Sequence, residues 1–192
     1  IGEVKAGDRM VVRQKGVVVA DIPAKSLTDE APIYDQPSVE PAHVAAAREW
    51  TPDGLTDLSP GEVDGALRQL LAHPTIASKR WVWSQYDHMV MAGTTVEPGS
   101  DAGVVHLAVA GIDKRLAIAN DCNNRFCFLD PYHGAQIAFV ECMRNLACSG
   151  ARALAVTDNL NFGNPNKPEV FYMLSECVKG LAEACRFFDV PV

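Results

Sequence analysis

Five prolines interrupt the chain between residues 24 and 60, and they limit where regular structure can form. Proline lacks a backbone N–H and disfavours the helical conformation of the residue before it, so no long helix or central strand can run through this segment. The pattern predicts a linker over residues 24–60 that crosses a surface, tied down by Ile33, Tyr34 and Trp50. The prolines are Pro32, Pro37, Pro41, Pro52 and Pro60.

Two apolar segments before the linker predict a β-hairpin. Residues 9–13 and 17–20 are rich in valine and are separated by a short turn that contains Gly16. Glycine accepts a positive φ, which tight hairpin turns require. The chain should therefore begin with two antiparallel strands.

A helix is predicted directly after the linker. Ser59 and Glu62 have the spacing of a capping box, and Pro60 stands at the first helical position. Apolar residues recur behind them at helical spacing, and His73 followed by proline ends the pattern. Residues 79–91 predict a second, less regular helical segment.

From residue 94 onward the pattern alternates between strands and helices. Strands are predicted at 104–110, 115–119, 153–157 and 190–192, and helices at 134–149 and from residue 168 onward. The last helix should bury an apolar stripe made of Val170, Leu174, Val178, Leu181 and Cys185.

Composition and charge exclude several classes of protein. Hydrophobic residues make up 48% of the 192 residues, enough for a core, and the net charge of −7 disfavours binding to nucleic acid or to a membrane surface. No segment has the ~20 apolar residues of a membrane span. The six cysteines form no Cys-x-x-Cys pair, which argues against zinc and favours a reducing, cytoplasmic setting.

The polar segment 157–165 is the strongest candidate for a binding loop. It follows a predicted buried strand and precedes a helix, where α/β layers commonly place ligands. Asp158 could hold a metal–phosphate complex or accept from a nucleotide, and Asn161 and Asn164 could donate to phosphate oxygens. Because Asn, Gly and Pro also build ordinary turns, a plain loop is the alternative interpretation.

A second group of polar residues offers weaker candidates. Asp121 and Asp130 are carboxylates of the kind that suits Mg²⁺, but Asp130 is better explained as the N-terminal cap of the following helix. Asn145 lies inside that helix, where it is either solvated or directed into a site. Residues 86–88 (Tyr-Asp-His) lack a nucleophile nearby and are interpreted as structural. The chain has no glycine-rich phosphate loop.

Longer motifs, in order and spread over nearly the whole chain, resemble the phosphoribosylformylglycinamidine synthase family of purine biosynthesis, in its small stand-alone form. The motif richest in polar residues is the segment that contains Asp158 and leads into the last helix. The matching segments are 77–82, 85–88, 98–102, 129–132, 155–170 and 180–186.

The resemblance implies an α+β fold. The family has two tandem copies of a unit shared with aminoimidazole ribonucleotide synthetase, whose N-terminal half contributes a mixed β-sheet with flanking helices to a shared barrel. Residues 1–36 would end the first copy's C-terminal α+β domain, 37–59 would be the linker, and 60–192 would be most of the second copy's N-terminal domain. The start at Ile1 and the strand-like sequence at both ends likewise predict a section of a longer protein.

The resemblance also implies an activity. The family uses ATP and Mg²⁺ to convert formylglycinamide ribonucleotide and glutamine-derived ammonia into the amidine, with a glutaminase subunit and a small third subunit as partners. The family's catalytic histidine motif has no match in this chain, so the isolated segment is expected to be inactive. Asp158 matches a family position that contacts ATP, and Asp121 is a secondary candidate for the same nucleotide. No residue of this chain is expected to be a metal ligand.

Two positions depart from the family pattern. Related synthetases have Asp where this chain has Asn145, and the family usually has Asp-Gly-Asn where this chain has Asp121, Cys122 and Asn123. The loss of glycine at position 122 predicts a changed loop, since glycine takes a positive φ freely. The alternative function is a non-catalytic nucleotide-binding or scaffold module of the same superfamily.

Overall fold

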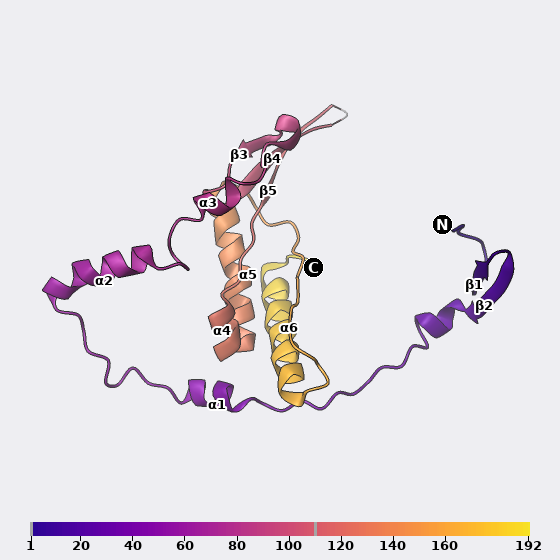
Figure 1. Ribbon diagram of the computed structural model, residues 1–192, viewed down its shortest axis with the longest axis horizontal. Coiled ribbons are helices and arrows are strands. Elements are labelled where there is room, and N and C mark those ends of the chain that lie inside the picture. Colours follow the sequence, from indigo (N-terminus) through magenta and orange to yellow (C-terminus); the bar gives the residue numbers. More distant parts are fainter. Residues whose placement is uncertain (1, 110) are drawn as a thin grey trace. The chain divides into compact units, whose positions relative to one another are not determined.

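The computed structural model describes residues 2–109 and 111–192. Ile1 and Ala110, the last residue of one predicted strand, lie outside this range. The chain forms two compact units, Ile1–Gln36 and Pro37–Val192 (Figure 1).

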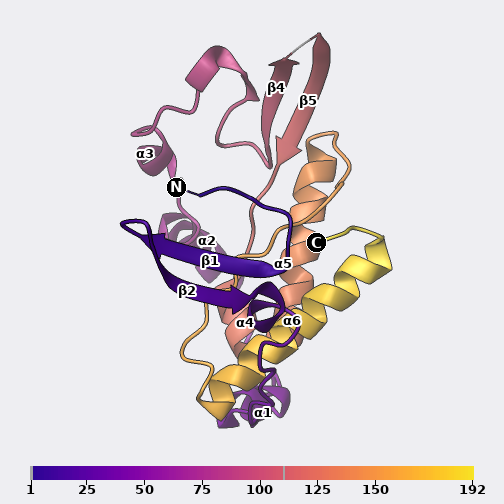
Figure 2. The same ribbon diagram turned by 90° about the vertical axis from the view of Figure 1, so that its right-hand side faces the viewer.

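The first unit is built on a β-hairpin. Strand β1 (Arg9–Gln14) pairs antiparallel with β2 (Val17–Pro23), and Figure 2 shows the two strands side by side. Lys15 and Gly16 in the turn have φ values of 50° and 82°, the two positive values that a type I′ turn needs. A 3₁₀ turn, η1 (Ala24–Leu27), follows. The predicted hairpin is confirmed.

The linker contains a helix that the sequence pattern did not predict, α1 (Ala42–Arg48). Val44 of α1 is completely buried, and the ring of His43 stacks on Phe128 with centroids 4.0 Å apart. Just before α1, the Val39 N–H donates to the carbonyl oxygen of Pro168 at 3.2 Å. Small apolar and backbone contacts therefore attach this segment to the second unit.

The side chains predicted to tie the linker down are exposed. Ile33, Tyr34 and Trp50 are 98%, 73% and 66% exposed. The prediction was wrong for Trp50, which lies in the second unit and leaves most of its side chain in solvent.

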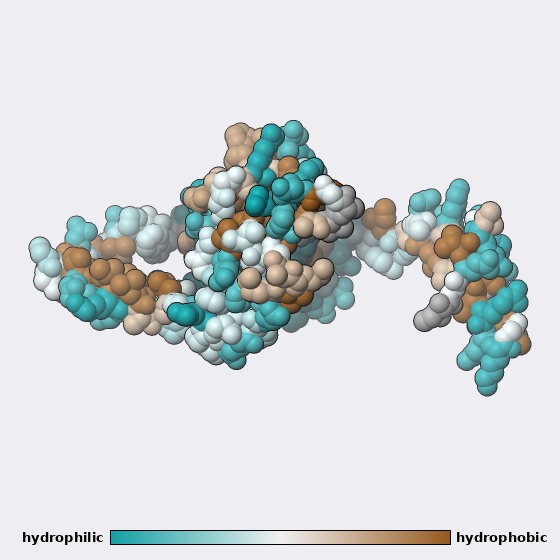
Figure 3. Space-filling view, turned by 90° about the horizontal axis from the view of Figure 1, so that it is seen from above, coloured by the Kyte–Doolittle hydropathy of each residue, from teal (hydrophilic) through white to brown (hydrophobic). Residues whose placement is uncertain are grey.

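Helix α2 (Pro60–Ala72) begins and ends as predicted. The Ser59 hydroxyl and the Ser59 N–H donate to Glu62 Oε2 at 2.5 and 2.9 Å, and these two hydrogen bonds lower the pKa of Glu62. The helix leaves its apolar face exposed (Figure 3). Only two short turns form within 79–92, α3 (Arg80–Trp83) and η2 (Val90–Ala92), so the second helical segment is shorter than predicted.

Three antiparallel strands form the sheet of the second unit. They are β3 (Thr94–Val96), β4 (Gly103–Val109) and β5 (Ile112–Ile118), in the order β3-β4-β5. The β4–β5 register pairs Gly103 with Ile118 and Val109 with Ile112. The two strands predicted here are confirmed, and β5 leads directly to Asp121.

Three helices follow the sheet. Helix α4 (Asn124–Leu129) packs on α5 (Pro131–Cys148), and α5 lies beside the long α6 (Pro168–Phe188) in Figures 1 and 2. At the close approach, Gly180 meets the backbone of Tyr132 with no room for a side chain. The core of this layer is formed by Phe139, Ala184, Cys185 and Val190.

Two strand predictions were wrong. Residues 153–157 and 190–192 are extended but are not assigned as strands, and the two segments share one backbone bond, from the Val156 N–H to the Pro191 carbonyl oxygen at 2.9 Å. A strand needs a ladder of such bonds along a neighbour. These segments are apolar because they pack on the helices: Ala153 and Val156 contact the core cluster.

The predicted stripe of α6 was also partly wrong. Val178 is 41% exposed, while the buried positions are Cys177, Gly180, Ala184 and Cys185. Successive steps of four residues advance 400° around a helix, so a stripe read as 170, 174 and 178 drifts by 40° at each step. The buried positions Cys177, Gly180 and Ala184 are separated by a step of three and a step of four residues, which keeps them closer to one face, and Cys185 lies next to Ala184.

The mixture of helices and antiparallel sheets agrees with the predicted α+β class. Among the helices of the described residues, none combines the length and the apolar character needed to cross a membrane.

Candidate functional site

The loop that contains Asp158 connects an extended segment to the start of α6. Its asparagines are partly occupied by the loop itself: Asn161 Nδ2 donates to the Asn159 carbonyl oxygen at 3.0 Å, and Asn164 Oδ1 accepts from the Asn166 N–H at 2.9 Å. Asn164 thus forms the turn that leads into α6. The plain-loop interpretation accounts for Asn164, but it leaves Asp158 without a structural role.

Asp158 is exposed, and its carboxylate makes no side-chain hydrogen bond or ion pair with another residue in 2–109 or 111–192. It lies close to the inner face of α6. Burial raises the pKa of the thiols of Cys177 and Cys185, and the negative charge of Asp158 raises both further. The site therefore presents an available carboxylate at the edge of the packed helices.

The structure brings Asp121 and Asn145 together, although they are 24 residues apart. Asn145 Nδ2 on α5 donates to Asp121 Oδ2 at 3.3 Å, just after β5 ends. Burial raises the pKa of the neighbouring Cys142 thiol, and the charge of Asp121 contributes to that rise. Asn145 is thus directed toward the secondary candidate, and sequence spacing alone gave no sign of this pairing.

Asp130 is a helix cap, as predicted. Its carboxylate accepts from the His133 backbone N–H at 3.1 Å and lies 2.7 Å from His133 Nδ1. Burial opposes the ionisation of Asp130, but the hydrogen bonds and charge of His133 outweigh burial and lower its pKa. Its role is the start of α5.

In the loop after Asp121, Cys122 does not have a positive φ, so the backbone at this position is not left-handed. Asn123 caps α4 by accepting from the N–H groups of Arg125 and Phe126 at 3.1 and 3.3 Å. The Sγ atoms of Cys122 and Cys127 lie 3.9 Å apart. The sequence pattern did not predict α4, although an asparagine at its N-cap was a usable signal.

The Tyr-Asp-His segment fits its structural interpretation. Asp87 Oδ1 accepts from the Met89 N–H at 2.8 Å, which forms a local turn. His88 meets the edge of Trp83, with ring centroids 5.6 Å apart. The two side chains therefore serve different neighbours and do not form a dyad.

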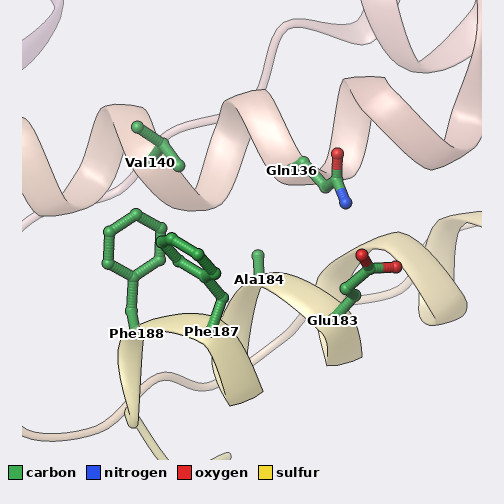
Figure 4. A pocket seen from close by; sticks show the side chains of 6 residues that line it. All are labelled: Gln136, Val140, Glu183, Ala184, Phe187 and Phe188. Atoms are coloured by element: carbon green, nitrogen blue, oxygen red, sulfur yellow. The ribbon is translucent and has the colours of Figure 1, made fainter.

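Two shallow hollows lie apart from the candidate carboxylates. A groove of about 220 Å³ runs between α5 and α6 and is lined by six side chains (Figure 4). A second, of about 420 Å³, lies along α4 and is mostly apolar. The groove in Figure 4 is lined by Gln136, Val140, Glu183, Ala184, Phe187 and Phe188.

The candidate carboxylates are too few to hold a metal ion without other ligands. In the part of the chain that the structure describes, no three His, Cys, Asp or Glu side chains are arranged to hold a metal ion. Mg²⁺ at nucleotide sites is commonly held by one or two carboxylates together with the phosphates and water. Asp158 and Asp121 do not form a metal cage by themselves.

Part of the chain matches a known family of protein domains. Residues 99–192, which span β4 to the end of α6 and include both candidate carboxylates, match the family described as AIR synthase related protein, N-terminal domain. These residues are therefore similar to that domain, which agrees with the α+β fold.

The particular relatives follow from similarity over the whole chain. The chain is 51% identical over 193 residues to the phosphoribosylformylglycinamidine synthase subunit PurL of Deinococcus radiodurans. It is 48% identical over 195 residues to the subunit of that name from Anaeromyxobacter dehalogenans, and 44% identical over 193 residues to that from Alkaliphilus metalliredigens. All of this chain is covered, but it spans only about a quarter of each relative's length. The resemblance predicted from the sequence motifs is confirmed.

Proposed function

We propose that this chain is part of an ATP-dependent ligase that makes formylglycinamidine ribonucleotide in purine biosynthesis. Its substrates are formylglycinamide ribonucleotide and glutamine-derived ammonia. The observation that carries the proposal is the 51% identity, over the whole chain, to a phosphoribosylformylglycinamidine synthase subunit. The activity belongs to the whole enzyme, and residues 1–192 alone are expected to be inactive.

Within that enzyme, Asp158 contributes to an ATP site and Asp121 is a secondary contact. The available carboxylate of Asp158 supports this role, since the loop gives it no other partner. Mg²⁺ supplies charge neutralisation of the phosphates when it is bound. Asp158 accepts a hydrogen bond from the nucleotide.

The proposed surroundings follow from the same family. The partners are a glutaminase subunit and a small third subunit, the setting is the cytoplasm, and neither nucleic acid nor a membrane is a partner. Residues 1–36 are the C-terminal end of one domain, residues 37–59 are the linker, and residues 60–192 form most of the following domain. The compact units Ile1–Gln36 and Pro37–Val192 support a boundary at this place.

The test is Asp158→Asn in the full-length protein, with ATP affinity measured by calorimetry. Removing one charge-assisted contact costs roughly 1.5–3 kcal/mol, which corresponds to about a 10- to 100-fold weaker affinity. Asp57→Asn is the matched control, because Asp57 is also exposed but lies in the segment before α2. Equal ATP affinity of the two variants would refute the role of Asp158.

The alternative function is a nucleotide-binding or scaffold module without a catalytic part. This alternative is supported by the loop at residues 157–165, which presents one available carboxylate, that of Asp158. A catalytic site needs more functional groups than this loop presents. The two functions differ in steady-state kinetics with ammonia as the nitrogen donor. If the ATP site is catalytic, Asp158→Asn raises the KM for ATP. If the bound nucleotide is structural, Asp158→Asn lowers the stability of the protein and leaves that KM unchanged.

A further inference from the structure

Two cysteines face each other across the first turn of α4. Cys122 directly precedes the N-cap Asn123, and Cys127 is four residues after that cap, so they occupy the N′ and N4 positions. These positions are the ones that a hydrophobic staple brings into contact at a helix start. Here the contact joins two thiols, with the Sγ atoms 3.9 Å apart.

The backbone holds this geometry in place. Asn123 accepts from two N–H groups of the first turn, and the Cys127 N–H donates to the Asn123 carbonyl oxygen at 3.1 Å. Cys127 is also fixed from the other side, because a side chain at Gly134 of α5 would meet the Cys127 backbone nitrogen at 2.5 Å. Closing the gap to the ~2.05 Å of a disulfide therefore falls on Cys122, which lies before the helix.

The two thiols differ in accessibility. Cys122 is exposed and Cys127 is half-buried. Burial, and then the neighbouring Cys122, raise the pKa of Cys127 to about 12, which keeps that thiol protonated. The nearby Cys177 is buried, so an oxidant from solvent meets Cys122 first.

We propose that Cys122 and Cys127 form a reversible disulfide on exposure to hydrogen peroxide. The Cys122 thiolate attacks one peroxide oxygen, the O–O bond breaks, and a sulfenic acid and hydroxide result. The Cys127 thiol then loses its proton, its sulfur attacks the Cys122 sulfur, and the S–O bond breaks; the hydroxide that leaves takes up this proton as water. In total the two thiols lose two electrons, and the peroxide is reduced to water. A dithiol reduces the disulfide back to two thiols by thiol–disulfide exchange.

This modification site is independent of the proposed ligase function, but it adjoins the secondary candidate residue. Asp121 is next in the chain to Cys122 and accepts from Asn145. A disulfide at Cys122 would restrict the backbone that carries Asp121. Oxidation is therefore expected to act on the start of α4 and on the Asp121–Asn145 hydrogen bond together.

Peptide mapping tests the proposal on the full-length protein. Trypsin cleaves at Arg125, between the two cysteines, so the disulfide links peptide 116–125 to peptide 126–144. The protein is treated with hydrogen peroxide, remaining thiols are alkylated, and the linked peptides are sought by mass spectrometry. We expect the pair at a mass two hydrogens below the sum of its parts, and its loss on adding dithiothreitol.

Two variants assign the bond, because peptide 126–144 also contains Cys142. The cross-link should persist in Cys142→Ser and disappear in Cys127→Ser. The proposal is overturned if the cross-link follows Cys142, if peptide 116–125 is joined to the peptide of Cys177, or if Cys122 advances to sulfinic acid without any cross-link.

Discussion

Gly180→Ala tests whether the close approach of α5 and α6 organises the second unit. Gly180 is buried, and a Cβ built there would lie 2.8 Å from the carbonyl carbon and 3.0 Å from the Cα of Tyr132. Real Cβ atoms rarely come this close to other atoms. The obstacle is backbone, so no side-chain rotation relieves it, and the two helices must separate.

The size of the effect follows from two opposing contributions. Overpacking a well-fitted contact costs about 1–3 kcal/mol, and a backbone obstacle belongs near the upper end. Alanine in place of glycine inside a helix returns about 1 kcal/mol. The expected result is a net loss of about 1–2 kcal/mol, or a roughly 5- to 30-fold larger population of locally opened α5 and α6.

Hydrogen exchange measured by mass spectrometry on the full-length protein reads this locally. Amides of α5 and α6 should exchange faster in Gly180→Ala. Gly65→Ala is the matched control, since Gly65 is also inside a helix but has no atom within 4 Å of a built Cβ, and it should slow exchange in α2. If Gly180→Ala were as protected as the parent protein, the close helix contact would not exist as described.

Two further substitutions probe other contacts. Val44→Ala removes a completely buried side chain and should weaken the attachment of α1 by about 2 kcal/mol, seen as faster exchange over residues 42–48 with exchange in α2 unchanged. Asp130→Ala should cost about 1 kcal/mol at the start of α5 at pH 7, measured by urea denaturation followed by the exchange of α5 amides. Because the folded protein lowers the pKa of Asp130, its stabilisation is complete above the ordinary value of 3.8 and is lost as the pH falls through the lower folded value. The parent protein and Asp130→Ala should therefore converge in stability in acid, and a difference that persists there would contradict the cap.

Local signals in the sequence predicted the fold well where the interaction is itself local. The Ser59–Glu62 hydrogen bond, the Asp130 cap and the hairpin turn at Gly16 each join residues a few positions apart. Their energies depend on backbone geometry that short motifs specify. The same is true of the cysteines at N′ and N4, although their proximity required knowing that α4 begins at Asn124.

The features that were missed depend on distant parts of the chain. Asn145 bonds to Asp121 across 24 residues, and α1 is held by Phe128 and by the backbone of Pro168. Residues 153–157 have the composition of a strand, but strand formation needs a neighbour as well as composition. For the loop at residues 157–165, the motif predicts that Asp158 contacts ATP, and this stays a prediction.

The contacts of Gly134 and Gly180 have a consequence for how this chain can vary. Gly134 faces the backbone of Cys127, and Gly180 faces that of Tyr132, so α4, α5 and α6 all converge on positions without a Cβ. Every single-base change of a glycine codon that alters the amino acid introduces a Cβ. No single-base substitution at these two codons therefore gives a residue that fits the existing space. A change at either position requires a compensating shift of a helix.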